Sequence, residues 1–210
     1  MDPERALALS YAPAHARDGL AALFALDDRL RDIVRAARDP TIGLMRLTWW
    51  GDALIRLDTA PCPAEPVLTS VASLVLPAGV GGVDLEVVVD AWARLLEPEE
   101  VDLEAFAKER GRTLFLAAAR VLGGPVDERI GQAGEGWALA TLAQERPALL
   151  DAARPLASER FAAAFRQPWS RESRALGALA LLARFDVAGM TRPGSPRRVG
   201  RLLMHRLTGW

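Results

Sequence analysis

The chain has 210 residues, half of them hydrophobic and a quarter charged, with a formal net charge of −1. This size and composition fit one soluble globular domain with a sizeable core, and the near-neutral charge excludes the broad basic field of a general nucleic-acid binder. The single cysteine, Cys62, cannot form an internal disulfide, and two histidines cannot supply a zinc-ligand cluster.

The amino terminus and the hydropathy pattern favour a cytoplasmic protein. Met1-Asp-Pro-Glu-Arg is charged and lacks the apolar segment of a secretory signal. No apolar run approaches the ~20 residues needed to span a bilayer. We therefore expect a cytoplasmic chain, for which a peripheral position on the inner membrane stays open.

The first predicted helices end before residue 40. Asp2 reads as the N-cap of a short helix that ends near Ser10. Apolar residues at steps of three and four then predict one long helix over 13–38. Asp27 and Arg31 lie four apart on the flank of its apolar face, a spacing that predicts an ion pair along the helix.

A second long helix is predicted over 42–57. Asp39-Pro40 ends the preceding helix, and Thr41 is placed to cap the new one. Because apolar residues cover most of its circumference, we expect this helix at the centre of a bundle, with Trp49 and Trp50 in the core.

The rest of the chain also reads as helix. No segment shows a convincing period of two, so the predicted fold class is all-α, a single-domain antiparallel bundle. Gly131, Gly134 and Gly136 fall inside one helix and predict close approach of a neighbouring element. The remaining helices are predicted at 66–76, 84–96, 102–122, 126–144, 147–153, 158–166, 170–185 and 196–207.

Acidic residues suggest one kind of chemistry. Asp28 and Asp32 lie one helical turn apart, so their carboxylates can share Mg²⁺ ions that bind phosphates. The alternative is a solvated face on which neighbouring arginines neutralise them. Ionisation of a diphosphate needs a second carboxylate set, for which the chain offers Glu135, Glu145 and Asp151, with no two of them four apart. The candidate catalytic residues are Asp28, Asp32 and Glu145, and the candidate metal ligands are Asp28 and Asp32.

Several segments resemble the squalene/phytoene synthase family over roughly residues 5–150. They are Leu20-Ala-Ala-Leu-Phe-Ala-Leu, Arg31-Asp-Ile-Val, Ile42-Gly-Leu-Met-Arg-Leu-Thr-Trp-Trp-Gly-Asp-Ala-Leu, Phe106-Ala-Lys-Glu-Arg-Gly-Arg-Thr-Leu-Phe-Leu and Ile130-Gly-Gln-Ala-Gly-Glu-Gly-Trp-Ala-Leu. The resemblance implies a shortened isoprenoid synthase fold, in which two aspartate-rich segments face each other across a central cavity and bind Mg²⁺ and prenyl diphosphates.

The chain departs from the family at both motifs. Where the family has Asp-Asp-x-x-Asp, this sequence has Arg31-Asp32-Ile-Val-Arg35, and the second motif is replaced by Ala138, Thr141, Gln144-Glu145 and Leu149. Of the Gly-Arg-x-Tyr-Leu-Pro segment that should follow, only Arg154-Pro-Leu remains. The pattern is more similar to a divergent branch that includes an assembly factor of respiratory complex I. The candidate ligand-binding residues are Arg31, Arg35, Arg46, Trp50 and Trp137.

The last segment, 191–210, is predicted as a basic amphipathic helix appended to a domain of residues 1–190. It carries five arginines and no acidic residue, and Val199, Leu202, Leu203 and Leu207 lie among them. One interpretation is a helix that lies on an anionic membrane surface. The other is a helix that packs its apolar side on the bundle and leaves its arginines in solvent.

Three functions follow from these observations. The first is a degenerate, non-catalytic family member that helps to assemble or stabilise a membrane (respiratory) complex through a protein or lipid partner. The second is a Mg²⁺-dependent prenyltransferase that uses Asp28, Asp32 and Glu145. The third is a carrier that holds an isoprenoid lipid. Only the second needs a cofactor, and none involves nucleic acid.

Overall fold

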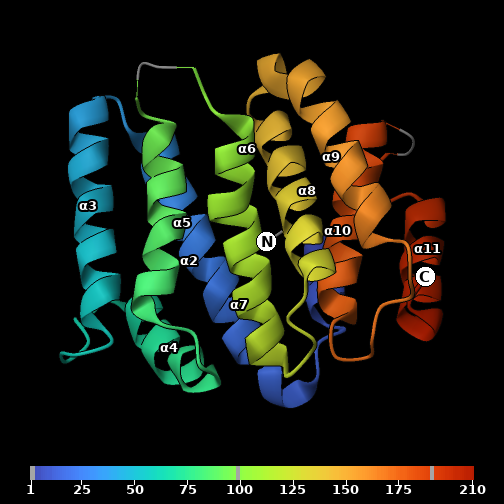
Figure 1. Ribbon diagram of the computed structural model, residues 1–210, viewed down its shortest axis with the longest axis horizontal. Helices are drawn as coiled ribbons and strands as arrows, with labels where there is room; N and C mark the ends of the chain where they lie inside the picture. Colours follow the sequence, from blue (N-terminus) through green and yellow to red (C-terminus); the bar gives the residue numbers. More distant parts are fainter. Residues whose placement is uncertain (1–2, 98–99, 190–191) are drawn as a thin grey trace.

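The computed structural model describes residues 3–97, 100–189 and 192–210, and every regular element in this part of the chain is helical. Figure 1 shows the helices side by side, from α3 at one edge to α11 at the other. The predicted all-α fold is confirmed. The helices are α1 (Pro3–Leu9), α2 (Arg17–Ala36), α3 (Pro40–Arg56), α4 (Pro66–Leu74), α5 (Gly82–Arg94), α6 (Leu103–Phe106), α7 (Thr113–Leu122), α8 (Glu128–Glu145), α9 (Leu150–Ala164), α10 (Arg174–Ala188) and α11 (Pro196–Thr208).

Short irregular helical turns complete the fold. A π-helical segment, Ala107–Arg112, joins α6 to α7, and single 3-10 turns lie at Ala14–Ala16, Leu76–Ala78 and Pro147–Leu149. The predicted cap at Asp2 lies outside the described residues. None of the described helices has the length and apolar character that crossing a bilayer would require.

Helix α8 lies in the middle of the bundle, against α9, α10, α7 and the π-helical segment. Its glycines make these contacts close. A Cβ on Gly134 would lie 2.1 Å from the carbonyl oxygen of Gly111, and a Cβ on Gly136 would lie 2.8 Å from the Phe161 ring. The predicted close approach at these glycines is confirmed, and it brings the π-helical segment into backbone contact with α8.

Helix α3 lies at the edge of the bundle, so the prediction that it is central is wrong. Its inner side packs on α5 and α2, and Trp50 is buried there. Ile42, Met45 and Trp49 face outward and are exposed, so only one tryptophan of the predicted core pair lies in the core. A helix at the edge has neighbours on one side only, whatever residues its other side carries.

Two local predictions also fail for identifiable reasons. Asp39, not Thr41, caps α3, because its Oδ1 accepts a hydrogen bond of 2.8 Å from the Thr41 backbone N–H and leaves Pro40 at the first helical position. The two helices predicted at 147–153 and 158–166 form one helix, α9, which continues through Pro155. Extensive packing of α9 along α8 offsets the hydrogen bond that the proline removes.

Candidate functional site

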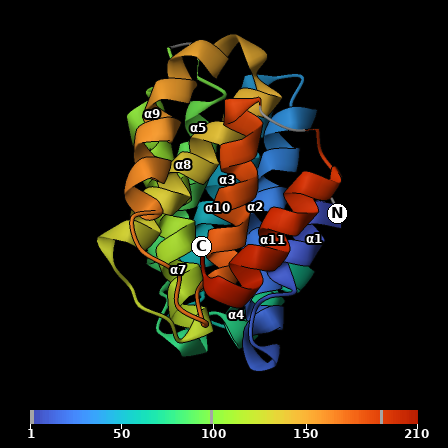
Figure 2. The same ribbon diagram turned by 90° about the vertical axis from the view of Figure 1, so that its right-hand side faces the viewer.

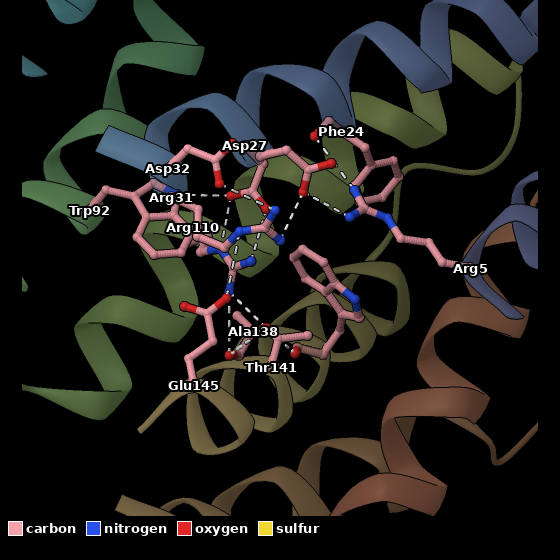
Figure 3. Close-up of polar contacts among 12 residues, drawn as sticks. Arg5, Phe24, Asp27, Arg31, Asp32, Trp92, Arg110, Ala138, Thr141 and Glu145 are labelled. Carbon is pink, nitrogen blue, oxygen red and sulfur yellow. Dashed lines mark hydrogen bonds and ion pairs between the residues drawn. The ribbon is translucent and has the colours of Figure 1, made fainter. Parts of the chain in front are cut away.

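A buried ion pair joins α2 to the π-helical segment in the interior of the bundle. Arg110 Nη2 and Nε lie 2.8 and 2.9 Å from Asp27 Oδ2 and Oδ1, and these side chains are 2% and 1% exposed. Trp92 Nε1 donates a further hydrogen bond of 2.9 Å to Asp27 Oδ1. Figure 3 shows the three side chains directed at one another. Burial raises the pKa of Asp27, but the charge and hydrogen bonds of Arg110 outweigh it and hold that pKa below its ordinary value.

Arg110 also links these elements to α8. Its guanidinium lies between two indole rings, 4.6 Å from the centre of the Trp92 ring and 4.4 Å from that of Trp137. Its Nη1 donates a hydrogen bond of 2.8 Å to Thr141 Oγ1. The wider π-helical turn changes the direction of the following side chains relative to an α-helix, and it is this segment that carries Arg110 inward.

The three candidate catalytic carboxylates do converge, but on an arginine. Arg31 lies 3.0 Å from Asp28, 3.6 Å from Asp32 and 3.7 Å from Glu145, measured between guanidinium nitrogens and carboxylate oxygens. A second guanidinium, that of Arg5, lies 2.8 Å from the same oxygen of Asp28. Partial burial raises the pKa of Glu145, and nearby arginines oppose the shift. The carboxylates therefore neutralise guanidinium groups.

The ion pair predicted between Asp27 and Arg31 is wrong. Asp27 points into the core, where Arg110 binds it in a bidentate manner. Arg31, one turn further on, instead reaches the partly exposed carboxylates around it. Asp27 and Arg31 do lie four residues apart on one helix. Asp27 nevertheless binds Arg110, which is distant in sequence, because that guanidinium donates two hydrogen bonds to its carboxylate.

A small cavity of about 200 Å³, lined by both charged and apolar side chains, lies beside these two clusters. Its charged wall consists of three arginines and three carboxylates: Arg5, Arg31, Arg110, Asp27, Glu145 and Asp186. The volume is below the ~300 Å³ at which pockets for drug-sized ligands begin. This cavity is balanced in charge and small, which suits water or a very small polar molecule better than a prenyl diphosphate.

The apolar interior next to it is filled by aromatic rings. Phe24, Phe115 and Trp137 pack against one another with ring centres 5.5 to 6.5 Å apart. All three are buried in the core formed by α2, α7 and α8. Their packing argues against the carrier interpretation, because an isoprenoid tail would need this volume.

The other predicted ligand-binding residues are not gathered in one site. Arg31 and Trp137 line the small cavity, whereas Arg35 lines a separate surface hollow beside α5 and the end of α8. Arg46 lines a hollow between α2 and α3 with Arg29. Trp50 is buried away from the cavity, with the Arg29 guanidinium 5.9 Å from its ring centre.

Glu135 and Asp151, the other carboxylates considered for a second metal-binding set, do not form such a set opposite Asp28 and Asp32. Glu135 is buried on α8 between two arginines, with Arg160 Nε at 2.7 Å and Arg112 Nη1 at 3.2 Å. Asp151 is exposed on α9. Among the described residues, no group of three His, Cys, Asp or Glu side chains is arranged to hold a metal ion.

Sequence reasoning missed Asp27 and Arg110 as partners, together with Trp92 and Thr141. Asp27 was assigned to the flank of its helix, and Arg110 carried no signal of burial. The one available signal was Gly111, since a glycine next to an arginine inside a predicted helix indicates close approach of another element.

Comparison with known proteins identifies relatives of this arrangement. The family model for squalene/phytoene synthase matches residues 1–156. The crystal structure of a dehydrosqualene synthase in complex with a ligand superposes with a TM-score of 0.75 over 97% of this chain and 90% of that one, at 16% sequence identity. At this identity the likeness concerns the fold alone. No curated protein matches the chain.

Proposed function

The chain belongs to the squalene/phytoene synthase family, and from that membership we propose that it is a non-catalytic member which helps to assemble or stabilise a membrane protein complex. The Asp27–Arg110 ion pair carries this proposal. It occupies the bundle interior with a guanidinium that is 2% exposed and fully engaged by a carboxylate, an indole pair and a hydroxyl.

Electrostatics support the absence of prenyl transfer. The resemblance implies Mg²⁺, which would have to be held by Asp28, Asp32 and Glu145. Those carboxylates surround Arg31, and two unit charges of the same sign a few ångströms apart repel each other by several kcal/mol at the intermediate dielectric of a protein, ~4 kcal/mol at 4 Å. The donor set therefore does not fit a cluster of divalent cations.

A filled interior leaves the outer surface as the part of the molecule that can act. Exposed large apolar side chains lie at both edges of the bundle, on α3 and on α11. Large exposed apolar residues that cluster on one face are typical of sites that bind proteins or membranes. The respiratory complex is the form of this function that the resemblance to the divergent branch suggests.

The proposal can be tested by complementation of a strain from which the gene for this protein has been deleted. A triple variant, Asp28→Asn, Asp32→Asn and Glu145→Gln, should restore the level of the membrane complex as well as the unaltered protein does. In parallel, the purified protein should consume neither farnesyl nor geranylgeranyl diphosphate with Mg²⁺ or Mn²⁺. Metal-dependent turnover that the triple variant abolishes would overturn the proposal in favour of a prenyltransferase.

A further inference from the structure

Helix α11 turns a charged side to the bundle. Arg198 is buried and lies 2.9 Å from Glu4 and 2.5 Å from Asp186, which ties α11 to α1 and α10. His205 is buried on the same side, with its Nε2 3.1 Å from the carbonyl oxygen of Arg174. Figure 2 shows α11 on the outside of α10 and α1. Of the leucines on this helix, only Leu202 is buried in the core.

The opposite side of α11 is an apolar ridge in solvent. Leu203, Met204 and Leu207 are exposed, Leu207 by 75%, and Trp210 is exposed just beyond the helix end. At 100° per residue, Leu203 and Leu207 lie in one line along the helix, with Met204 beside them. Arg197 and Arg201 flank this ridge on one side and Arg206 flanks it on the other, and all three are exposed. The alternative in which the helix packs its apolar side on the bundle therefore holds for Leu202 and is wrong for Leu203 and Leu207.

The charge around this ridge has one sign. After Asp186 the sequence contains no acidic residue, while Arg192, Arg197, Arg201 and Arg206 all follow. Over residues 3–97, 100–189 and 192–210, no ion pair joins these four arginines to a carboxylate. Their counterion is left to come from outside the chain.

A basic cavity of about 570 Å³ adjoins the end of the ridge. Arg17, Arg171, Arg174 and Arg206 line it against a single carboxylate, Glu172, and Leu207 of the ridge forms part of the same wall. The Arg206 guanidinium lies 5.2 Å from the centre of the Tyr11 ring, in this wall. Tyr11 is buried, and its hydroxyl has no hydrogen-bond partner among the described residues.

We propose that this surface docks on an anionic phospholipid membrane, an inference that rests on the proposed function because it names where that function takes place. Leu203, Met204 and Leu207 enter the boundary between headgroups and acyl chains, and the flanking arginines bind lipid phosphates. The cavity receives one headgroup phosphate. An apolar ridge with cations on both sides is the pattern of interfacial helices, since each cation near an anionic surface adds to binding.

Sedimentation with vesicles tests the docking surface on the full chain. We expect binding to phosphatidylcholine vesicles that contain about one-third phosphatidylglycerol, none to phosphatidylcholine alone, and weakening as salt screens the charges. The double variant Arg197→Gln/Arg201→Gln should bind about 25-fold more weakly, at about fivefold per arginine. Arg171→Gln should weaken binding by up to about fivefold through the cavity.

A control variant with the same loss of charge isolates the surface. Arg38→Gln/Arg56→Gln removes two exposed arginines at the other edge of the bundle and should leave binding within about twofold of that of the unaltered chain. Circular dichroism should show every variant folded. Equal losses in the two double variants, or binding that ignores lipid charge, would overturn the proposal. Inorganic phosphate at constant ionic strength can compete for the cavity alone, so a loss of vesicle binding beyond the roughly fivefold assigned to the cavity would overturn it as well.

The two proposals can fail separately. If the chain does not bind vesicles but still complements the deletion strain, the proposed membrane docking is wrong and the proposed assembly role is retained. The partner of α11 would then be an acidic protein surface. If vesicles are bound as expected but complementation fails, the assembly role falls. If Arg197→Gln/Arg201→Gln complements the strain as well as the unaltered chain does, the assembly role does not depend on lipid binding by α11.

Discussion

Arginine has opposite situations in two regions of this molecule. Arg110 is buried and paired with one carboxylate, that of Asp27, and the partly exposed Arg31 has three carboxylates around it. On the outer face of α11, Arg197, Arg201 and Arg206 have no ion-pair partner within the part of the chain that the structure describes. A guanidinium taken out of water needs a counterion from the protein, whereas one in solvent does not. The candidate metal-binding carboxylates are therefore paired with Arg31, whereas the arginines on the outer face of α11 can bind an external anion.

Breaking the buried pair should have the largest effect. Arg110→Met leaves Asp27 as an unpaired buried charge and should lower the free energy of unfolding by about 3–5 kcal/mol. Urea unfolding followed by circular dichroism measures it. Arg94→Met, which removes an exposed bidentate pair with Glu109, should cost less than about 1 kcal/mol.

A double variant tests whether the cost arises from the stranded charge. Asp27→Leu/Arg110→Met removes both charges and should recover much of the loss. Trp92 Nε1 then loses its acceptor, which retains a cost of about 1–3 kcal/mol. If the double variant is as unstable as the single one, packing of the Arg110 stem between the indoles, not charge, holds the interior together.

The backbone contact that places Arg110 inward gives the next largest effect. A Cβ on Gly111 would lie 2.1 Å from the Gly134 carbonyl oxygen, so Gly111→Ala must separate the π-helical segment from α8. We expect a loss of about 1–3 kcal/mol in urea unfolding, together with a change in near-ultraviolet circular dichroism from Trp92 and Trp137. Gly200→Ala is the matched control, because nothing lies within 4 Å of its Cβ, and it should stabilise α11 by up to about 1 kcal/mol.

The sequence predicted much of the fold because helical periodicity is local. The apolar period of α2 and the glycines of α8 describe contacts within a few turns or the absence of a side chain. The edge position of α3 escaped prediction, because an apolar circumference does not reveal on how many sides a helix has neighbours. The family resemblance, confirmed over residues 1–156, supplied the overall arrangement.

The site was harder to predict because its main partners are far apart. Asp27 and Arg110 are separated by 83 residues, and the π-helical segment that turns Arg110 inward leaves no mark in an α-helical period. The convergence of Asp28, Asp32 and Glu145 fits their selection as candidates, but their common partner, Arg31, decides what they can do. Tertiary contacts decide whether such a carboxylate binds a metal ion or an arginine.

His205 is buried where α11 packs on the bundle, and we expect its titration to make the stability of the protein depend on pH. Burial beside Trp169 and Phe165 lowers the pKa of His205, although backbone hydrogen bonds at Arg174 and Trp210 oppose the shift. Between this lowered pKa and the ordinary value of about 6.5, the unfolded chain binds a proton that the folded chain does not. Stability should therefore fall as the pH drops below about 6.5, by at most about 1.4 kcal/mol per pH unit.

Comparison with His205→Gln isolates this group from the acids that titrate at lower pH. Urea midpoints measured between neutral and mildly acidic pH should show a steeper decline for the unaltered chain than for the variant, because glutamine takes up no proton. Arg174 and Arg201 also disfavour the charged imidazole and remain in both proteins. Parallel pH profiles would mean that His205 keeps its ordinary pKa and that other groups set the acid sensitivity.

The smallest expected effect separates folding from the outer face of α11. Leu203 is 47% exposed and lies next in sequence to Leu202, which is 0% exposed. Leu203→Ala should change the free energy of unfolding by no more than about 0.5 kcal/mol, because an exposed leucine leaves no cavity behind. Leu202→Ala removes the same atoms from the core and should cost about 2–5 kcal/mol. If Leu203→Ala proves as costly as Leu202→Ala in urea unfolding, the ridge is part of the core in solution. The arginines of α11 would then border a packed helix, and the outer face of α11 would no longer differ from the interior in the way described.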